Sequence, residues 1–510
     1  MFKKYILIVA CCLSFFFSKS QSILYSEPDK NDVRNLDFEI VGRLNNHYLI
    51  YKNNRNNYSV SVYDDEMKQV TNEKLDFMPN RVINTDILTY RNFWYLFYQY
   101  QRRNIVYCMA AKLDGDGKLI GDVQELDTTV INVFMNNKVY SMLYSEDKQK
   151  IAFVKINTKD QNYNQVSSIL FNNELVRQSK SVFNIDMPER NNFLTEFNID
   201  NNGDLVFLRA AGNSQKDNIS AITLITKQSD SVHPKLHDVI TDRIYLDDVR
   251  LKVDNVNKNY LLASFYSKSK RGNIDGLYAS LFNKEADSIV SSTQTSFNED
   301  LRNDAKEQGN AKYAFNDFFL QNIVMRKNGG YVVAAESVYS TSRGNQYNRW
   351  DYFNSYNSGF LGSPYYYSPY SSYGVFGYYP WYRSGFGYQN TRYFADNVVV
   401  LAFDSTANLT WSNVIHKSQY DDNTDDFIGY TTLNTGNEVH FLYNETERKN
   451  VLLSDQKVKP DGKVERAPTL KNLDRGFEFM PRLGKQVAAK QMIIPCTYRN
   501  YICFAKVDFQ

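Results

Sequence analysis

One pattern recurs along almost the whole chain: a strand, a tight polar turn and a second apolar strand, then a loop and further short strands. These apolar runs are bounded by turn-forming Asn, Asp and Gly, which is typical of β-strands in hairpins. Eight strand pairs occur, at 38–53, 83–100, 139–157, 193–211, 249–267, 318–337, 427–445 and 479–498. Units of about 45–60 residues suit one four-stranded sheet each. The repeat therefore predicts an all-β protein built from about eight similar sheets.

Third strands recur as well, for example at 58–65, 105–114 and 397–404. A single sheet of this kind cannot bury both of its faces, so successive sheets must stack around an axis. In the form of this repeat the chain resembles the β-propeller superfamily. The resemblance implies a single closed β-propeller of about eight four-stranded blades. No WD dipeptides, kelch double glycines or Asp-box series accompany the repeat, so no subfamily is indicated.

The two ends of the chain are expected to meet in the last blade. The eighth unit ends after its third strand, at Phe509, and residues 22–27 precede the first unit as a short unassigned strand. If this strand completes the eighth sheet, it closes the ring and protects the sheet edges. The alternative architecture is a pair of smaller β-domains, divided near residue 245 or residue 310.

The N-terminus has the pattern of an export signal. Two lysines precede an apolar stretch at 5–17, and Ser18 and Ser20 are small residues at the −3 and −1 positions before Gln21. This is typical of a secretory signal peptide and is too short for a transmembrane helix. Residues 1–20 are therefore predicted to be a signal peptide and 21–510 the propeller domain. A lipoprotein signal through Cys11 is the alternative.

The overall composition limits the partners that the protein can have. The formal net charge is only +2 and charges of both signs are interspersed, which argues against a nucleic-acid surface. No later segment is long and apolar enough to be transmembrane. The signal and the Asn-, Lys- and Tyr-rich composition resemble exported proteins of the Bacteroidota. The last predicted strand runs to the end of the sequence with no separate C-terminal sorting domain, so we expect a location in the periplasm or in association with the outer membrane.

The sixth unit departs from the repeat through an insertion at 340–396, between its second and third strands. Residues 344–394 include 13 Tyr, 5 Phe, 2 Trp and 7 Gly, with only two aliphatic residues. Such a segment is too poor in aliphatic residues for a core and too aromatic for a plain linker. Aromatic side chains dominate the energetics of protein interfaces. We therefore predict partner binding by Trp350, Tyr365, Tyr366, Tyr367, Tyr370, Tyr378, Tyr379, Trp381 and Tyr382.

Propeller topology also predicts which loops share a face with the insertion. Loops between second and third strands lie on the same face as the links between successive blades. The insertion, the basic loop at 268–271 and the acidic link at 421–426 are therefore expected on one face. The alternative for the insertion is a low-complexity loop, or a flap that folds back on the propeller.

The best candidate for a metal site is the acidic cluster Asp421, Asp422, Asp425 and Asp426. Hard cations such as Ca²⁺ bind several carboxylate and carbonyl oxygens, and no other cofactor is predicted. The Gly and Glu of a complete EF-hand loop are missing, so a solvated acidic turn is the alternative.

Cysteines are few, which indicates that packing rather than a disulfide framework stabilises the fold. Beyond the signal the chain contains Cys108, Cys496 and Cys503. The segment 496–503 predicts a hairpin that sets its two cysteines opposite each other. They would form a cross-strand disulfide or remain two buried thiols.

No catalytic motif stands out in the sequence. There is no G-x-S-x-G elbow and no phosphate-binding glycine loop, and the five histidines lack metal-ligand spacing. We therefore predict a non-enzymatic scaffold that docks an envelope protein or an outer-membrane complex. The alternatives are a glycan-binding protein that uses the same aromatic residues and a hydrolase or lyase that acts on polysaccharide.

Overall fold

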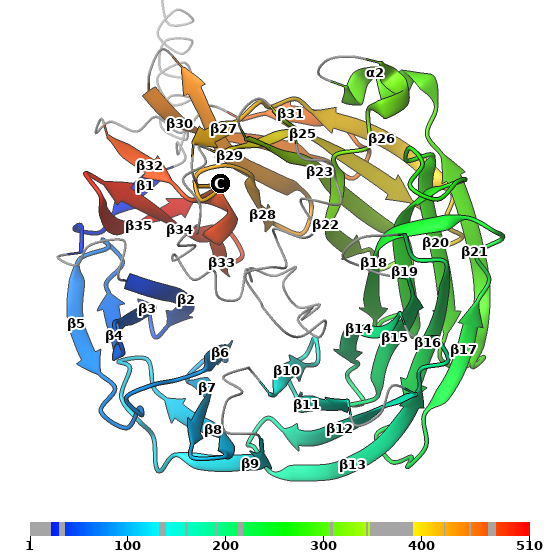
Figure 1. Ribbon diagram of the computed structural model, residues 1–510. Helices are drawn as coiled ribbons and strands as arrows, with labels where there is room; N and C mark the ends of the chain where they lie inside the picture. Colours follow the sequence, from blue (N-terminus) through cyan, green and yellow to red (C-terminus); the bar gives the residue numbers. More distant parts are fainter. Residues whose placement is uncertain are drawn as a thin grey trace, which may run out of the picture.

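The structure is a computed structural model, and it describes residues 22–29, 36–131, 139–158, 162–189, 191–212, 218–306, 310–342, 345–346, 391–422, 424–447, 450–467 and 476–509. Eight antiparallel sheets surround a common axis, each with its first strand innermost (Figure 1). The protein is therefore an eight-bladed β-propeller, as the repeat predicts. The alternative of two smaller β-domains is wrong.

The first four blades have four strands each. Blade 1 contains β2 (Leu36–Leu44), β3 (His47–Asn54), β4 (Asn57–Tyr63) and β5 (Gln69–Lys74). Blade 2 contains β6 (Asn84–Thr89), β7 (Trp94–Arg102), β8 (Ile105–Leu113) and β9 (Gln124–Val130). Blade 3 contains β10 (Ser141–Tyr144), β11 (Lys150–Thr158), β12 (Tyr163–Asn172) and β13 (Arg177–Asp186). Blade 4 contains β14 (Asn192–Ile199), β15 (Leu205–Ala211), β16 (Ala221–Lys227) and β17 (Lys235–Val239).

The later blades carry the additions. Blade 5 contains β18 (Tyr245–Asp254), β19 (Asn259–Ser267), β20 (Gly276–Asn283) and β21 (Ser288–Ser296). Blade 6 contains β22 (Phe318–Met325), β23 (Tyr331–Ser342), β24 (Asn345–Gln346), β25 (Thr391–Phe403), β26 (Leu409–Ile415) and β27 (Tyr420–Asp422). Blade 7 contains β28 (Tyr430–Asn434), β29 (Val439–Glu447), β30 (Asn450–Val458) and β31 (Val464–Arg466). Blade 8 contains β32 (Phe477–Phe479), β33 (Lys485–Ala488), β34 (Gln491–Tyr498), β35 (Tyr501–Asp508) and β1 (Ser22–Tyr25).

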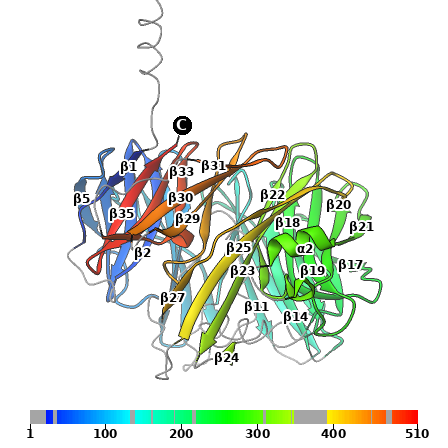
Figure 2. The ribbon, with the colours of Figure 1, turned by 90° about the horizontal axis from the view of Figure 1, so that it is seen from above.

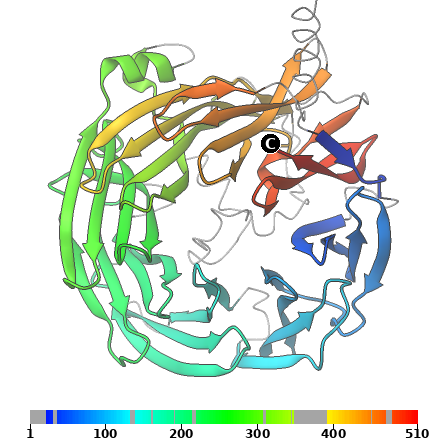
Figure 3. The same ribbon diagram turned by 180° about the vertical axis from the view of Figure 1, so that it is seen from behind.

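Both ends of the chain contribute to blade 8, as predicted for residues 22–27. Strand β1 pairs antiparallel with β35, from Ser22 opposite Asp508 to Tyr25 opposite Ala505. Figures 1 and 3 show the blue N-terminal strand against the red C-terminal strands from both sides. The Tyr25 ring stacks on Phe477 with 4.2 Å between centroids. Hydrogen bonds between the chain ends therefore close the ring.

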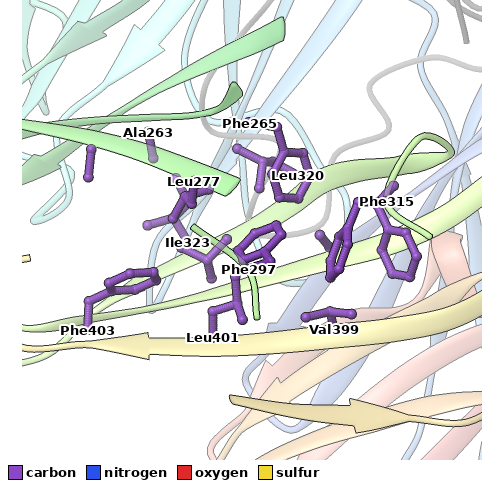
Figure 4. Close-up of a cluster of buried hydrophobic side chains, with 14 of the residues drawn as sticks. Ala263, Phe265, Leu277, Phe297, Phe315, Leu320, Ile323, Val399, Leu401 and Phe403 are labelled. Carbon is purple, nitrogen blue, oxygen red and sulfur yellow. The ribbon is translucent and has the colours of Figure 1, made fainter. Parts of the chain in front are cut away.

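The hydrophobic core consists of clusters between neighbouring blades. Figure 4 shows the cluster between blades 5 and 6, to which Phe265, Leu320 and Val399 contribute. The link between these blades also forms helix α2 (Glu299–Ala305) and the 3-10 helix η3 (Ala311–Tyr313). The Asn298 side chain accepts a hydrogen bond from the N–H of Leu301 at the start of α2. Leu301 is buried in this cluster, which fixes the helix on the sheets.

The outer rim of the ring is protected against strand pairing. Five of the outermost described strands, β5, β9, β13, β21 and β26, shift register against their neighbour through a β-bulge. A bulge twists an edge strand and interrupts its row of backbone hydrogen-bonding groups. The rim is therefore poorly suited to pairing with a strand of another chain. No helix in the described part of the chain has the length and apolar character needed to cross a membrane.

Candidate functional site

Blade 6 carries a stem of three paired strand segments at the base of the insertion. Its strands β23 and β25 contain 12 and 13 residues, and they pair from Tyr331 opposite Phe403 to Ser342 opposite Thr391. β24 pairs with β23, and β27 pairs with β25 at Arg392–Phe394. Figure 2 shows these long strands running to the edge of the ring where β24 and β27 lie. We call residues 338–342, 391–395 and 420–422 the stem.

Aromatic stacking and one ion pair hold the stem together. The rings of Tyr339 and Phe394 stack with 4.6 Å between centroids. Arg392 donates two hydrogen bonds to the Asp422 carboxylate, at 2.7 and 3.0 Å, and lies 4.5 Å from the centroid of the Tyr420 ring. This pairing holds the pKa of Asp422 below its ordinary value. Side chains from all three strands thus fix the stem as a unit.

A buried ion network lies where the stem joins the blade. The Glu336 carboxylate is 2.8 Å from the Lys417 Nζ and 3.4 Å from an Arg482 Nη atom. Arg482 also contacts Asp425 at 3.2 Å. The side chains of Glu336 and Lys417 are only 2% and 1% exposed. Burial holds the pKa of Lys417 below its ordinary value, and the opposing charge of Glu336 offsets only part of this shift.

This network connects three blades through the link between blades 6 and 7. The Lys417 Nζ donates to the carbonyl oxygen of Ala395, at 2.7 Å, and to the Gln419 side chain, at 2.8 Å. The Gln419 side chain donates in turn to the carbonyl oxygen of Asn444 in blade 7, at 2.8 Å. Arg482 comes from blade 8. The stem is therefore anchored to blades 6, 7 and 8 together.

A break in the inner strand of blade 8 positions Arg482. The 3-10 helix η5 (Pro481–Leu483) interrupts that strand and divides it into β32 and β33, which both pair with β34. Proline lacks a backbone N–H and cannot complete a strand ladder. Opposite η5, Gly429 has φ +87°, and a Cβ atom there would collide with the Arg482 side chain.

Replacing Gly429 by Ala is therefore expected to displace Arg482 from Glu336 and Asp425. We expect a loss of about 2–4 kcal/mol in the free energy of unfolding, from the positive φ and the collision together. Gly436 is the matched control, because it has φ +93° but a methyl group there would meet no atom within 4 Å. Gly436→Ala should show the conformational cost alone, about 1–2 kcal/mol. Equal losses in urea unfolding of the two variants would contradict this role of Arg482.

Three of the four aspartates predicted to bind a metal have separate side-chain partners, and the fourth, Asp421, has a buried carboxylate oxygen. Asp422 pairs with Arg392, Asp425 pairs with Arg482, and Asp426 accepts a hydrogen bond from the Thr424 hydroxyl at 2.5 Å. Across the described ranges, no three His, Cys, Asp or Glu side chains are grouped so that they could hold a metal ion. The structure therefore does not bring the predicted calcium ligands together. They form part of the stem and its base instead.

Three carboxyl groups near the stem titrate close to neutral pH. Burial raises the pKa of Asp421 to about 7, with further contributions from the negative charges of Asp426 and Glu478. Burial also raises the pKa of Asp426 and of Asp317 to about 6. These groups lie on the links into and out of blade 6. The surroundings of the stem therefore gain negative charge between mildly acidic and neutral pH.

A second buried charged cluster lies on the inner strands of blades 4 and 5. Glu196 adopts φ +56° at a β-bulge of β14, and burial raises its pKa to about 7. Its carboxylate accepts a hydrogen bond from the N–H of Leu251 at 2.9 Å and lies 3.7 Å from Arg250. Asp248 contacts the same guanidinium at 2.8 Å. These contacts connect two neighbouring inner strands, and no sequence motif indicated them.

The nine residues predicted to bind a partner lie outside the described residues: Trp350, Tyr365, Tyr366, Tyr367, Tyr370, Tyr378, Tyr379, Trp381 and Tyr382. Their role therefore stays a prediction. The prediction that the acidic link lies beside the insertion is confirmed at the stem, where β27 of this link pairs with β25 at the end of the insertion.

The predicted hairpin at the C-terminus is confirmed. It turns at Arg499 and Asn500, which both have positive φ, and Cys496 lies directly opposite Cys503. The two thiols are buried and are not bonded to each other.

Comparison with known proteins assigns no family to this chain. No protein-family model matches the sequence, and no curated protein matches it significantly. Among solved structures, prolyl oligopeptidase B from Galerina marginata aligns at 7% identity and a TM-score of 0.41, over 92% of this chain and 56% of that one. The chain thus spans about half the length of the prolyl peptidases that it matches.

Two other solved structures align over most of both chains. An ulvan lyase aligns at 11% identity and a TM-score of 0.35, over 82% of this chain and 90% of that one. An apocarotenoid oxygenase from Synechocystis aligns at 8% identity and a TM-score of 0.33, over 97% and 94% of the chains. Similarities this remote assign no activity to this chain.

Proposed function

We propose that this protein is an exported, non-enzymatic interaction module of the bacterial cell envelope that docks a partner through residues 344–394. The observation that carries the proposal is the stem. Its strands β23 and β25 are the longest of the described strands. They continue past the blade and hold both ends of the aromatic segment side by side. A fixed base lowers the entropic cost of presenting a binding segment.

The buried ion network at the base of the stem favours a function in which the insertion must be held in a fixed position. Buried ion pairs are weak stabilisers, since hydrophobic residues of similar volume often serve the fold equally well. Here Glu336, Lys417 and Arg482 join strands and links of three blades where the stem begins. Register shifts in five of the outer strands disfavour strand pairing at the rim, so the face that carries the insertion is the more suitable surface for a partner.

The chemistry of the segment indicates what kind of contact it makes. Tyr and Trp provide large, rigid contact areas with few rotatable bonds, and they are enriched at the centres of protein interfaces. The 13 Tyr and 2 Trp of residues 344–394 match that composition. The pattern of residues 1–20 supports export. An envelope protein or an outer-membrane complex is therefore the partner that we propose.

The test is a deletion that keeps the stem intact. Residues 347–390 are replaced by a short Gly-Ser turn, and the intact and deleted proteins are compared in crosslinked capture from native membranes. We expect a partner that only the intact protein captures, and saturable binding when that partner is purified. Both forms should show the same melting temperature, because the deletion removes none of the described blade residues.

Equal capture by the intact and deleted proteins would reject the insertion as the docking element. If neither form captures a protein, polysaccharide binding is measured next, with Trp350→Ala and Trp381→Ala as variants. Saturable binding lost in these variants would identify a glycan-binding protein instead.

A further inference from the structure

The two cysteines of blade 8 lie close enough to react with each other. Cys496 on β34 and Cys503 on β35 are directly opposite in the antiparallel register, and their Sγ atoms are 3.0 Å apart. Facing residues of antiparallel strands have Cα atoms about 4.5–5.5 Å apart, within the range that a disulfide spans. An S–S bond of about 2.05 Å therefore requires the sulfur atoms to approach by only about 1 Å.

This pair lies in the core of the blade that closes the ring. Both side chains are fully buried, in one cluster with Phe477, Phe479 and Val507. Cys496 pairs across the sheet with Phe479, and the ring of Tyr25 from β1 packs on the same two phenylalanines. A covalent bond here would connect β34 to β35, the strand on which the N-terminal strand is held.

We propose that Cys496 and Cys503 form an intramolecular disulfide when the protein meets a disulfide donor, and that this bond secures the closing blade. One thiolate attacks a sulfur of the donor and releases the first donor thiolate, giving a mixed disulfide. The second cysteine thiolate attacks the cysteine sulfur of this mixed disulfide, forms the intramolecular S–S bond and releases the second donor thiolate. The two cysteine protons pass to the two donor thiolates, so two cysteine thiols are oxidised while one donor disulfide is reduced.

Burial determines when this reaction can occur. It raises the pKa of the Cys496 thiol, and contact with Cys503 raises it further, so little thiolate exists in the folded blade. The bond should therefore form slowly in folded protein and rapidly while the chain folds among disulfide donors. The proposed export supplies such an environment, and the inference depends on the proposed function only for this setting.

The test uses the full chain, refolded from urea with oxidised glutathione or with dithiothreitol, then denatured and alkylated. Peptide mapping follows Cys108, Cys496 and Cys503 separately, so the two cysteines near the N-terminus do not interfere. After refolding with glutathione we expect alkylation at Cys108 only, and a peptide spanning 496–503 that is lighter by about 2 Da. After refolding with dithiothreitol all three should be alkylated.

The variant Cys503→Ser provides the matched control, because it removes the second step but not the first. It should accumulate a glutathione adduct on Cys496, and its urea midpoint should not rise on oxidation as that of the wild type does. Alkylation of both Cys496 and Cys503 in oxidised wild type, while the variant forms its adduct, would overturn the proposal. None of these results depends on partner capture, so failure here is distinguishable from failure of the proposed function.

Discussion

Glu336→Gln is expected to lower the free energy of unfolding by about 3–5 kcal/mol, because it removes the nearest carboxylate from the buried Lys417 ammonium and leaves only the more distant charge of Asp396. Lys417 is only 1% exposed, so bulk solvent cannot replace the lost carboxylate. Arg482 loses one of its two carboxylate partners in the same variant. The measurement is urea unfolding at neutral pH. The base of the stem should also become more accessible to hydrogen exchange at residues 391–395.

An exposed ion pair supplies the control for this substitution. Lys68 and Glu66 are 2.6 Å apart, but both side chains are more than two-thirds exposed, at 73% and 70%. Glu66→Gln should leave the urea midpoint unchanged, since solvent screens such pairs. Replacing Glu336 by Leu together with Lys417 by Met should recover much of the lost stability, because it removes both buried charges. If Glu336→Gln changed the free energy of unfolding as little as Glu66→Gln does, the network would not anchor the stem.

Asp421→Asn is expected to stabilise the protein at pH 8 and to have little effect at pH 4. The pKa of Asp421 is raised to about 7 in the folded protein, from an ordinary value of 3.8. A raised carboxyl pKa means that the folded state binds the proton more tightly, so stability falls as pH rises between about 4 and about 7. The asparagine side chain does not ionise, so Asp421→Asn should keep the unfolding free energy that the wild type loses, about 1–4 kcal/mol at pH 8.

The measured quantity is the difference in the free energy of unfolding between Asp421→Asn and the wild type at each pH. Carboxyl groups with lowered pKa values, such as Asp422 and Asp127, act in the opposite direction in both proteins and cancel in this difference. Asp76→Asn serves as the control, because that side chain is 76% exposed. A stabilisation by Asp421→Asn that is equal at pH 4 and pH 8 would contradict the buried, near-neutral titration of this carboxyl group.

The sequence predicted the architecture because the repeat is local. Each blade is a set of consecutive hairpins, so apolar runs and turn residues reveal the eight units without any long-range information. The pairing of β1 with β35 was also predicted, since the last unit lacked a strand and the N-terminal segment was unassigned. Helix α2 was missed because it is only 7 residues long. Asn298 followed by two acidic residues was an N-terminal helix signal that could have indicated it.

The buried base of the stem could not be predicted in the same way. Glu336 lies in the sixth unit, Lys417 in the link that follows it and Arg482 in the eighth unit, and none of them belongs to a spaced motif. Only closure of the ring and the break at η5 bring them together. Topology did place the acidic link beside the insertion. It could not show that Asp422 and Asp425 have basic partners, because these partners come from other strands and another blade.

The most direct test of the central claim replaces the nine predicted partner-binding aromatic residues of the insertion with serine and keeps the length of the chain. Partner capture and melting temperature are measured on the same preparation. Our account predicts that the variant has the same melting temperature as the wild type and no longer captures the partner. Undiminished capture by a variant with the wild-type melting temperature would show that the aromatic insertion is not the docking element.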